Sequence, residues 1–464
     1  MQTEVIVIGG GIGGLSVAYE LGRQHVPFIV LERARRAGGV ILSEEIDGYT
    51  IDAGPDALFT QKPDGIKLCE ELGLGSELVP TKPPRLAYIQ RGGRLHPLPA
   101  ASVLGIPTRL GPFLTTKLFS WRGKLRMAGE LFVPPRRTSG DESIGSFMTR
   151  RFGAEATTYL AEPLLAGIHA GDVNRLSIRL LFPRLAEAER VHGSLLRAFR
   201  RPSRDRTSND GVFRSLPGGL SQMVRALMAS LPAEAVRLDA PVRRVRTRGS
   251  PIPFSVETDD GAQLASRVVV FATPAYVTSA LAMELDAELS RLCREVPYVS
   301  TATVVFAFRR SDVAHALNGS GFVVPRVEHD SILAGSWMSS KWPHRAPADR
   351  VLLRTFVGGA RDPRALERSD AELVLQSLTS LKPLLGITGE PLFTRVYRWD
   401  RATAQHEVGH AERLEAIERL LANLSGLFVT GSGFRGIGIP DCVADGRATG
   451  MRVAQYLAKA QTQA

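Results

Sequence analysis

Short apolar runs near both ends of the chain predict buried strands next to helical patterns. Residues 4–8 and 28–31 are two such runs, and the apolar positions between them have helical spacing. Residues 426–430 form a further run, followed by a glycine-rich loop over residues 431–438 and then a helix. The first segment therefore predicts a complete βαβ unit, and the last predicts another strand and helix.

Three runs in the middle of the chain predict a meander of antiparallel strands. They cover residues 242–247, 254–258 and 263–271, and residues 259–261, Asp-Asp-Gly, supply a tight turn between the second and the third. We assign this meander to the same domain as the two ends of the chain. That domain is then discontinuous, with inserted segments between its parts.

The first inserted segment carries an amphipathic pattern. Its apolar positions recur at steps of three and four, and Gly123 interrupts them: Leu114, Leu118, Trp121, Leu125, Ala128 and Phe132. Basic residues surround this stripe, with Glu130 as the only acid between residues 82 and 137: Lys82, Arg85, Arg91, Arg94, Arg109, Lys117, Arg122, Lys124, Arg126, Arg136 and Arg137. Both core packing and an interfacial segment on anionic lipid remain open.

Composition narrows the class of protein. The chain has 464 residues, is 44% apolar and carries a formal net charge of +11, so it can bury a large core. Cys69, Cys293 and Cys442 are widely separated and match neither a metal site nor a disulfide framework, so we expect buried thiols in a reducing compartment. With no signal peptide and no apolar run of about 18 residues, we expect a cytoplasmic protein, with peripheral attachment to the inner face of the cell membrane left open.

The glycines after the first strand predict a dinucleotide site. Gly9 permits the tight turn, Gly11 lets the backbone approach a pyrophosphate, and Gly14 allows close packing of helix on strand. The helix N-terminus then faces the phosphates. Glu32 ends the next strand about 20 residues on, where an acid accepts hydrogen bonds from ribose hydroxyls.

The residues after Glu32 favour FAD over a nicotinamide cofactor. Arg36-x-Gly38-Gly39 and then Gly54-Pro55 follow in an order that resembles the flavin amine oxidase superfamily. That resemblance implies non-covalent FAD, because no attachment motif surrounds Cys442. The residues predicted to contact the cofactor are Gly9, Gly10, Gly11, Ile12, Gly13, Gly14, Glu32, Arg33, Arg36, Gly38, Gly39, Val40, Gly54, Pro55, Asp56, Ala57, Val242, Trp399, Gly431, Ile437, Gly438 and Ile439.

Two further segments narrow the resemblance. Residues 162–172, Glu-Pro-Leu-Leu-Ala-Gly-Ile-His-Ala-Gly-Asp, and residues 436–443, Gly-Ile-Gly-Ile-Pro-Asp-Cys-Val, resemble the oxygen-dependent protoporphyrinogen oxidase and coproporphyrinogen III oxidase family. The resemblance implies six-electron oxidation of a porphyrinogen of haem biosynthesis in three flavin cycles. Molecular oxygen would be the acceptor and hydrogen peroxide the by-product. No acid–base constellation and no metal site is apparent, which is consistent with chemistry carried by a flavin.

The resemblance also assigns the substrate side. It implies that Arg85 binds a substrate carboxylate, that the carbonyl of Gly167 lies near the reacting bridge, and that Val323 and Phe356 sandwich a pyrrole ring. The chain departs from the family at residues 404–406, Ala-Gln-His, where Pro-Gln-Tyr is common. We interpret His406 as a pocket-lining substitute rather than a catalytic base.

These inferences predict an α/β fold with three parts. A discontinuous Rossmann-like FAD-binding domain of the glutathione-reductase type is expected to comprise residues 1–80, 212–285 and 401–464. Residues 81–211 are expected to form a mostly helical insert that faces substrate and membrane. Residues 286–400 are expected to form a β-rich, α+β substrate-binding domain.

Several alternatives remain open. Both protoporphyrinogen IX, with two propionates, and coproporphyrinogen III, with four, fit the sequence, and the basic insert would suit four carboxylates. A flavin amine oxidase and a non-catalytic FAD or porphyrin carrier are alternative functions. The expected partners are the porphyrinogen, O2 and a membrane surface, with ferrochelatase or the next haem-pathway enzyme and a homodimer as further options; no nucleic acid is expected.

Overall fold

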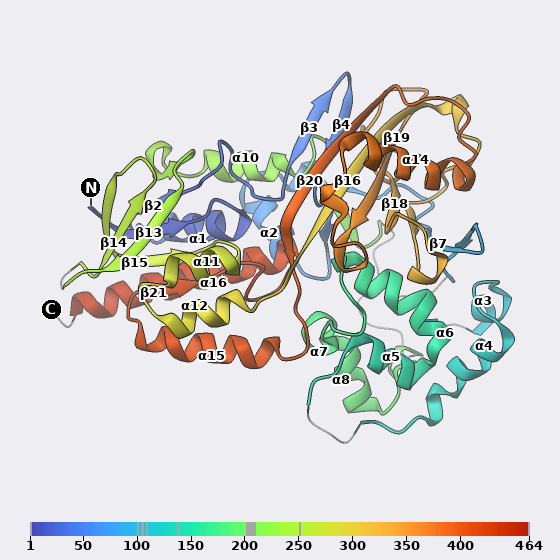
Figure 1. The fold of residues 1–464 in the computed structure, drawn as a ribbon, viewed down its shortest axis with the longest axis horizontal. Coiled ribbons are helices and arrows are strands. Elements are labelled where there is room, and N and C mark those ends of the chain that lie inside the picture. Colours follow the sequence, from blue (N-terminus) through green and yellow to red (C-terminus); the bar gives the residue numbers. More distant parts are fainter. Residues whose placement is uncertain are drawn as a thin grey trace.

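The computed structural model describes residues 2–99, 102–103, 106–107, 110–136, 140–200, 210–249 and 252–462. These residues form two large sheets and a group of helices (Figure 1). The first sheet lies with both chain ends, the second sheet lies beside it, and the helices α3 to α8 lie below the second sheet in this view. Residues from all three parts contribute to the candidate functional site.

The first sheet is mainly parallel and contains the predicted βαβ unit. Its strand order is β12-β2-β1-β15-β14-β13. In addition, β21 pairs in parallel with β15. β1 pairs in parallel with both β2 and β15. The strands are β1 (Gln2–Ile8), β2 (Phe28–Leu31), β12 (Val236–Arg237), β13 (Val242–Thr247), β14 (Phe254–Thr258), β15 (Gln263–Phe271) and β21 (Leu427–Val429). The predicted strands and meander are therefore confirmed, and they join one sheet.

Helices cover both faces of this sheet because its central strands are apolar on both sides. Val5 and Val7 face a core shared with α1, α10 and α16, whereas Ile6 and Ile8 face a core shared with α11, α12 and α15. The helices are α1 (Ile12–Arg23), α2 (Asp64–Glu71), α10 (Ser221–Ala229), α11 (Ala275–Ala282), α12 (Ala287–Arg294), α15 (His410–Asn423) and α16 (Ile439–Thr462). Segments from both chain ends thus pack together on one sheet.

The second sheet has the order β20-β16-β19-β18-β17-β7-β8. Its strands are β7 (Ala87–Arg91), β8 (Arg94–Pro97), β16 (Tyr298–Arg309), β17 (Gly321–Val323), β18 (Ala334–Trp337), β19 (Arg350–Gly358) and β20 (Phe393–Ala404). Helix α14 (Asp370–Leu385) shares the apolar core on one face, and α13 (Met338–Lys341) follows β18. From the sequence, residues 87–97, the hairpin β7–β8, are assigned to the helical insert. This assignment is wrong, because β7 pairs with β17 and the hairpin therefore belongs to the second sheet.

Smaller sheets connect the parts. β3 (Ser43–Ile46) and β4 (Tyr49–Asp52) form a hairpin. β11 (Phe213–Ser215) pairs with β5 (Leu58–Phe59) and β6 (Val79–Pro80), and β9 (Ser102–Val103) pairs with β10 (Ile106–Pro107). The 3₁₀ helices are η1 (Gly75–Glu77), η2 (Gly129–Phe132), η4 (Gly167–His169), η5 (Ala233–Ala235), η6 (Arg310–Asp312), η7 (Arg326–Glu328), η8 (Gly359–Arg361) and η9 (Ala365–Glu367).

The helical insert has its own apolar core and a buried ion pair. Its helices are α3 (Leu110–Thr115), α4 (Trp121–Ala128), α5 (Ile144–Phe152), α6 (Ala154–Ala156), the π-helix η3 (Thr157–Ala166), α7 (Ile178–Leu181), α8 (Pro183–His192) and α9 (Leu195–Arg200). Arg151 pairs with Glu130, and both side chains are fully buried. The Glu130 carboxylate also accepts hydrogen bonds from Ser194 and from the backbone of Leu195, so this pair joins three segments of the insert.

The predicted amphipathic stripe does not form one continuous helix face: its residues lie on α3, in the linker after α3, on α4 and on η2. Leu118 is buried in the linker between α3 and α4, where it packs in the core of the insert. The other five stripe residues are exposed: Leu114, Trp121, Leu125, Ala128 and Phe132. The chain leaves the helix between Thr115 and Trp121, which turns Leu118 inward. The basic residues Arg109 and Arg137 lie outside the described residues.

All three cysteines are buried, as predicted, and burial raises the pKa of each thiol to about 12. Among the residues that the structure describes, no helix is both long and apolar enough to cross a membrane. Within the same residues, no cluster of His, Cys, Asp or Glu side chains could hold a metal ion.

Candidate flavin and substrate site

The glycine-rich turn between β1 and α1 has the geometry of a phosphate cradle. Gly9 adopts φ +110°, and a Cβ on Gly14 would lie 2.0 Å from the carbonyl oxygen of Gly9, so both positions require glycine. A Cβ on Gly11 would meet no atom within 4 Å, so open space lies in front of this residue. No side chain caps the first amides of α1. These amides are therefore available to an anion beside Gly11.

Glu32 lies next to this cradle. Its carboxylate accepts hydrogen bonds from the backbone of Gly10, at 2.7 Å, and from that of Ala34, at 2.8 Å. Ala240 donates to the carbonyl of Glu32, so the chain leading to Val242 also runs beside this acid. The predicted ribose acid, Glu32, and the segment that leads to the predicted cofactor contact Val242 thus lie together.

The Arg36-x-Gly38-Gly39 loop packs directly on the glycine-rich turn. Gly38 donates to the carbonyl of Gly10, and the Arg36 guanidinium donates to the carbonyls of Ala37, Gly39 and Ile41. Burial lowers the pKa of Arg36. Arg36 therefore holds the loop in shape, which leaves Arg33, Gly39 and Val40 on its exposed side.

The next predicted contact, Gly54, lies against the same loop. A Cβ on Gly54 would stand 2.0 Å from the carbonyl oxygen of Val40, which only glycine avoids. The carbonyl of Gly54 accepts a hydrogen bond from Arg354 of β19 at 2.8 Å. Trp399 of β20 donates to the carbonyl of Ala53 at 3.2 Å. Side chains of the second sheet thus hold the backbone of residues 53 and 54.

Asp56, also predicted to lie at the cofactor, directs its carboxylate to the second sheet. Lys341 lies 2.7 Å from its Oδ2 and Trp342 donates to the same oxygen, while Arg354 lies 3.3 Å from its Oδ1. Burial opposes ionisation of Asp56, but the two cations outweigh it and hold its pKa well below the usual range. The Asp56 side chain is therefore an anchor between the domains, and its backbone is the part left for the cofactor.

The C-terminal loop closes the cradle from the other side. A Cβ on Gly13 would lie 3.5 Å from the Cα of Gly431, and a Cβ on Gly431 would meet open space. Beyond Gly431 the chain reaches α16, whose first residue is Ile439; Ile437 and Gly438 form its entry. The first turn of α16 also lies near this place, because a Cβ on Gly13 would stand 3.9 Å from the carbonyl oxygen of Cys442.

His406 does not line an open pocket, contrary to our interpretation. Its side chain is 2% exposed, and its Nε2 lies 2.9 Å from the carbonyl oxygen of Ser432 in the C-terminal loop. The ring stacks on His410, whose Nε2 lies 3.1 Å from the carbonyl oxygen of Phe434. Burial lowers the pKa of His406 to about 3. His406 thus supports the loop from behind.

Val323 and Phe356 lie on one face of the second sheet, in one row across its strands. Val323 pairs with Ala334, Ala334 pairs with Phe356, and Phe356 pairs with Thr303. With one strand between them, Val323 and Phe356 lie roughly 10 Å apart. The helical insert packs against Val323, and Trp399 donates to Thr303 at the other end of the row. Half-buried Ala334 and Phe356 lie between these two neighbours.

Gly167 is held near this row from the side of the helical insert. It follows the π-helix η3, in which Glu162 pairs with Arg361 at 2.9 Å. Ala360, four residues after Phe356, donates to the carbonyl of Ala170 at 2.8 Å. The Gly167 carbonyl accepts a hydrogen bond from Ala170 at 3.0 Å. π-helices are rare and are frequently found at functional sites.

Arg85 is exposed and lies two residues before β7. Its Nε donates to the carbonyl of Thr81 at 3.0 Å, and its side chain packs on Gly211. Arg85 therefore lies at the rim of the second sheet rather than beside Phe356.

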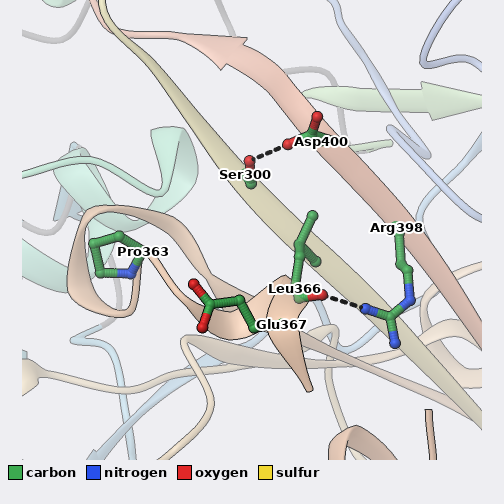
Figure 2. Close-up of a pocket in the computed structure, with 6 residues that line it drawn as sticks. All are labelled: Ser300, Pro363, Leu366, Glu367, Arg398 and Asp400. Carbon is green, nitrogen blue, oxygen red and sulfur yellow. Dashed lines mark hydrogen bonds between the residues drawn. The ribbon is translucent and has the colours of Figure 1, made fainter. Parts of the chain in front are cut away.

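An open cavity on the second sheet lies on the wrong face for this site. Figure 2 shows Ser300, Arg398 and Asp400 among the residues that line it, with Ser300 donating to Asp400 at 2.9 Å. Neighbouring side chains of a strand point to opposite faces, so Arg398 and Asp400 point away from Trp399. Because Trp399 contacts residue 53 beside the cradle, this cavity opens away from the cofactor side.

Comparisons with known proteins agree with this geometry. Residues 12–455 match the sequence profile described as flavin containing amine oxidoreductase. The chain belongs to this family. It is therefore a flavin-dependent oxidoreductase, and the cradle of Gly9, Gly11 and Gly14, with its uncapped helix and open space, fits a flavin nucleotide.

Relatives of this flavin oxidoreductase match it over almost its whole length. It is 35% identical to a coproporphyrinogen III oxidase of Bacillus subtilis, covering 98% of this chain and 99% of the relative. It is 27% identical to a chloroplastic protoporphyrinogen oxidase of Nicotiana tabacum, covering 99% and 86%. A solved structure of a putative protoporphyrinogen oxidase from Exiguobacterium has a TM-score of 0.86 at 32% identity, covering 98% and 99%.

The sequence reasoning missed the side chains of this flavin oxidoreductase that join its domains. Arg354 lies two residues before Phe356 on the same strand, so the alternation of β19 could have placed it on the same face. Lys341 and Trp342 lie about 285 residues from Asp56 in the sequence, and no local pattern connects them to it.

Proposed function

We propose that this protein is an FAD-dependent porphyrinogen oxidase and that coproporphyrinogen III is its natural substrate. The observation that carries the proposal is the row of Val323, Ala334 and Phe356 between the helical insert and the flavin cradle. The row is apolar and spans roughly 10 Å, and an apolar surface suits a porphyrinogen macrocycle. The names of the relatives support the same substrate class.

The cofactor of the proposal is FAD, held without a covalent bond. The uncapped N-terminus of α1 would hold its pyrophosphate, Glu32 a ribose, and residues 54–57 would lie along the ring system. When bound, the flavin supplies hydride acceptance and then reoxidation by O2. The balanced reaction converts one porphyrinogen and three O2 into one porphyrin and three H2O2.

The residues of the substrate side would mainly position the macrocycle. Val323 and Phe356 would contact a pyrrole ring, and the small side chain of Ala334 between them would leave room for that ring. Gly167, at the end of the π-helix, would contact the opposite edge, and Arg85 at the rim would bind a carboxylate with charge-assisted hydrogen bonds. Positioning is the main demand of hydride transfer to a bound flavin.

Two observations support the tetracarboxylate over the dicarboxylate. Three bacterial relatives, at 31–35% identity, are named coproporphyrinogen III oxidase, whereas five plant relatives named protoporphyrinogen oxidase match at 26–28%. The segment before and after Arg85 is also strongly basic, which suits additional carboxylates.

The test is oxidation of coproporphyrinogen III and protoporphyrinogen IX measured side by side by porphyrin fluorescence, with peroxide recorded and FAD content confirmed. We expect a higher kcat/KM for coproporphyrinogen III. A preference for protoporphyrinogen IX would reassign the substrate. FAD-loaded protein that oxidises amines but neither porphyrinogen would support the amine oxidase alternative, and FAD-loaded protein that oxidises nothing would support a carrier.

We also propose that the helical insert docks on anionic lipid at the inner face of the cytoplasmic membrane. Trp121 (68% exposed), Leu125 (72%) and Phe132 (85%) present apolar side chains, and the exposed cations Lys117 and Arg122 flank them. An apolar surface flanked by cations fits the interface of an anionic bilayer. Transfer of product to ferrochelatase or the next enzyme, and a homodimer, stay predictions.

Cosedimentation with vesicles of phosphatidylglycerol or of phosphatidylcholine tests the lipid proposal. We expect binding to phosphatidylglycerol that salt weakens and that the variant Trp121→Glu/Leu125→Glu loses. Leu375→Glu is the matched control, since Leu375 on α14 is 66% exposed but lies outside the insert. Equal sedimentation of the double variant and the native protein would refute the proposal.

A further inference from the structure

Arg354 connects the two sides of the proposed site. Its guanidinium donates to the carbonyl of Asp52 at 2.5 Å and to that of Gly54 at 2.8 Å. Trp399 donates to the carbonyl of Ala53, which lies between them. Three consecutive carbonyls of the segment before Pro55 are therefore held by side chains of β19 and β20.

The same guanidinium faces the proposed substrate side. Its central carbon lies 4.7 Å from the ring centroid of Phe356, two residues along β19 and on the same face of the sheet. A cation over an aromatic face attracts the ring and restricts its orientation. Arg354 thus contacts both the flavin-side backbone and the ring expected to touch the substrate.

The surroundings allow few other positions for this side chain. Arg354 is 3% exposed, and Asp56, 3.3 Å away, balances its charge. Asp56 is itself fixed by Lys341 and Trp342. A planar guanidinium can hold two carbonyls and a carboxylate at once, whereas a lysine ammonium is a single point charge.

We propose that Arg354 is a positioning residue that sets the placement of Phe356, and with it the substrate, relative to the flavin-side backbone at residues 52–54. The part of this inference that concerns substrate rests on the proposed function. Misplacement of reacting groups by about 1 Å costs roughly 100-fold in rate. Loss of the connection should therefore slow flavin reduction much more than it weakens substrate binding.

The variants are Arg354→Met, Arg354→Lys, Arg354→Ala and Phe356→Leu. Stopped-flow reduction of bound FAD by coproporphyrinogen III should be about 100-fold slower in Arg354→Met and about 10-fold slower in Arg354→Lys, with KM changed less than threefold. Added guanidinium should restore part of the rate in Arg354→Ala. Reduction by dithionite should be unchanged.

The matched control is Arg395→Met. Arg395 lies on β20 of the same sheet, separated from β19 by β16, with its guanidinium 5.7 Å from the ring centroid of Phe393, but it is exposed and holds neither flavin-side carbonyl. We expect native kinetics from this control. If Arg354→Met does not fold, Arg354→Lys decides the question, since it keeps a positive charge beside Asp56.

A double-mutant cycle tests the connection itself. If Arg354 acts through Phe356, the double variant Arg354→Met/Phe356→Leu should be little slower than Arg354→Met alone. Independent, multiplying effects would overturn the proposal, as would native flavin reduction in Arg354→Lys and Arg354→Met.

The proposed effect of Arg354 on the flavin-side backbone can be tested without porphyrinogen. The visible spectrum and midpoint potential of bound FAD should shift in Arg354→Met and stay native in Phe356→Leu, because of these two side chains it is Arg354 that donates to the flavin-side backbone. An unshifted spectrum and midpoint potential in Arg354→Met would contradict the proposed effect of Arg354 on the flavin-side backbone. If neither porphyrinogen reduces the flavin of the native protein, the proposed function is refuted instead. The two failures are thereby distinguished.

Discussion

The imidazole rings of His406 and His410 stack with centroids 4.1 Å apart and 12° between their planes. Each Nε2 faces a carbonyl of the C-terminal loop, that of Ser432 or of Phe434. A carbonyl only accepts, so each Nε2 carries a hydrogen. Burial lowers the pKa of both rings, for His406 to about 3. Two neutral imidazoles therefore support the loop that closes the flavin cradle.

This pair predicts sensitivity to acid. The pKa of His406 is about 3 in the folded protein and 6.5 normally. The part of the folding stability that depends on a neutral His406 ring is therefore complete above pH 6.5 and is lost as pH falls toward 3. The slope is about 1.4 kcal/mol per pH unit for each such ring. Urea unfolding at pH 7, 6 and 5 should show a smaller slope in His406→Gln, which keeps a donor but does not titrate.

Exposed His192, on α8, provides the control for this experiment. His192→Gln should retain the native pH slope. An identical slope in His406→Gln and the native protein would show that the stacked pair does not titrate with unfolding.

Gly11 and Gly14 should fail in different ways when replaced by alanine. In Gly14→Ala the new Cβ would overlap the Gly9 carbonyl, so we expect lower stability with and without FAD. In Gly11→Ala the new Cβ meets only open space, and the backbone at φ −68° accepts alanine, so apoprotein stability should be native while FAD affinity falls at least tenfold. Thermal unfolding of apoprotein and FAD titration separate the two, and native FAD affinity in Gly11→Ala would place the phosphates elsewhere.

The ion pair of Arg345 and Asp52 should contribute strongly to stability. Both side chains are fully buried, with Arg345 Nη2 2.8 Å from Asp52 Oδ2. Burial raises the pKa of Asp52 while Arg345 opposes the rise, so Arg345→Met leaves a costly uncompensated acid. We expect a loss of about 3–5 kcal/mol in the free energy of unfolding, measured by urea.

Two variants check this interpretation. The exposed pair Arg190–Glu187 is the control, and Glu187→Ala should cost less than about 1 kcal/mol. Asp52→Asn combined with Arg345→Met should recover part of the loss, because no uncompensated charge remains. A double variant no more stable than Arg345→Met would argue against the ion pair as the cause.

Arg85→Ala should raise KM about tenfold or more and leave FAD content native, because an exposed, charge-assisted contact is lost while the fold is kept. Arg94→Ala, on the exposed β8, is the control within the same basic segment. Steady-state kinetics with coproporphyrinogen III decide the matter. Unchanged KM in Arg85→Ala would remove this residue from the substrate site.

Several features of the site were predictable because their signals are local. The turn at Gly9 to Gly14 is specified by consecutive residues, and the strands before the turn and after the following helix are short apolar runs. The stripe from Leu114 to Phe132 does not form one helix face, because the chain leaves the helix between Thr115 and Trp121. His406 was misplaced because burial depends on what packs around a ring, in this case His410 and the C-terminal loop.

The sequence by itself determined the elements of the cofactor domain, its discontinuity and the glycines that only a close approach or a left-handed backbone explains. These follow from periodicity and steric limits within a few residues. Only the tertiary structure decided that Val323, Ala334 and Phe356 share a row, that β7 joins their sheet, and that Arg354 reaches the backbone of residues 52–54. Strand order and register depend on pairings between distant segments, which no local pattern specifies.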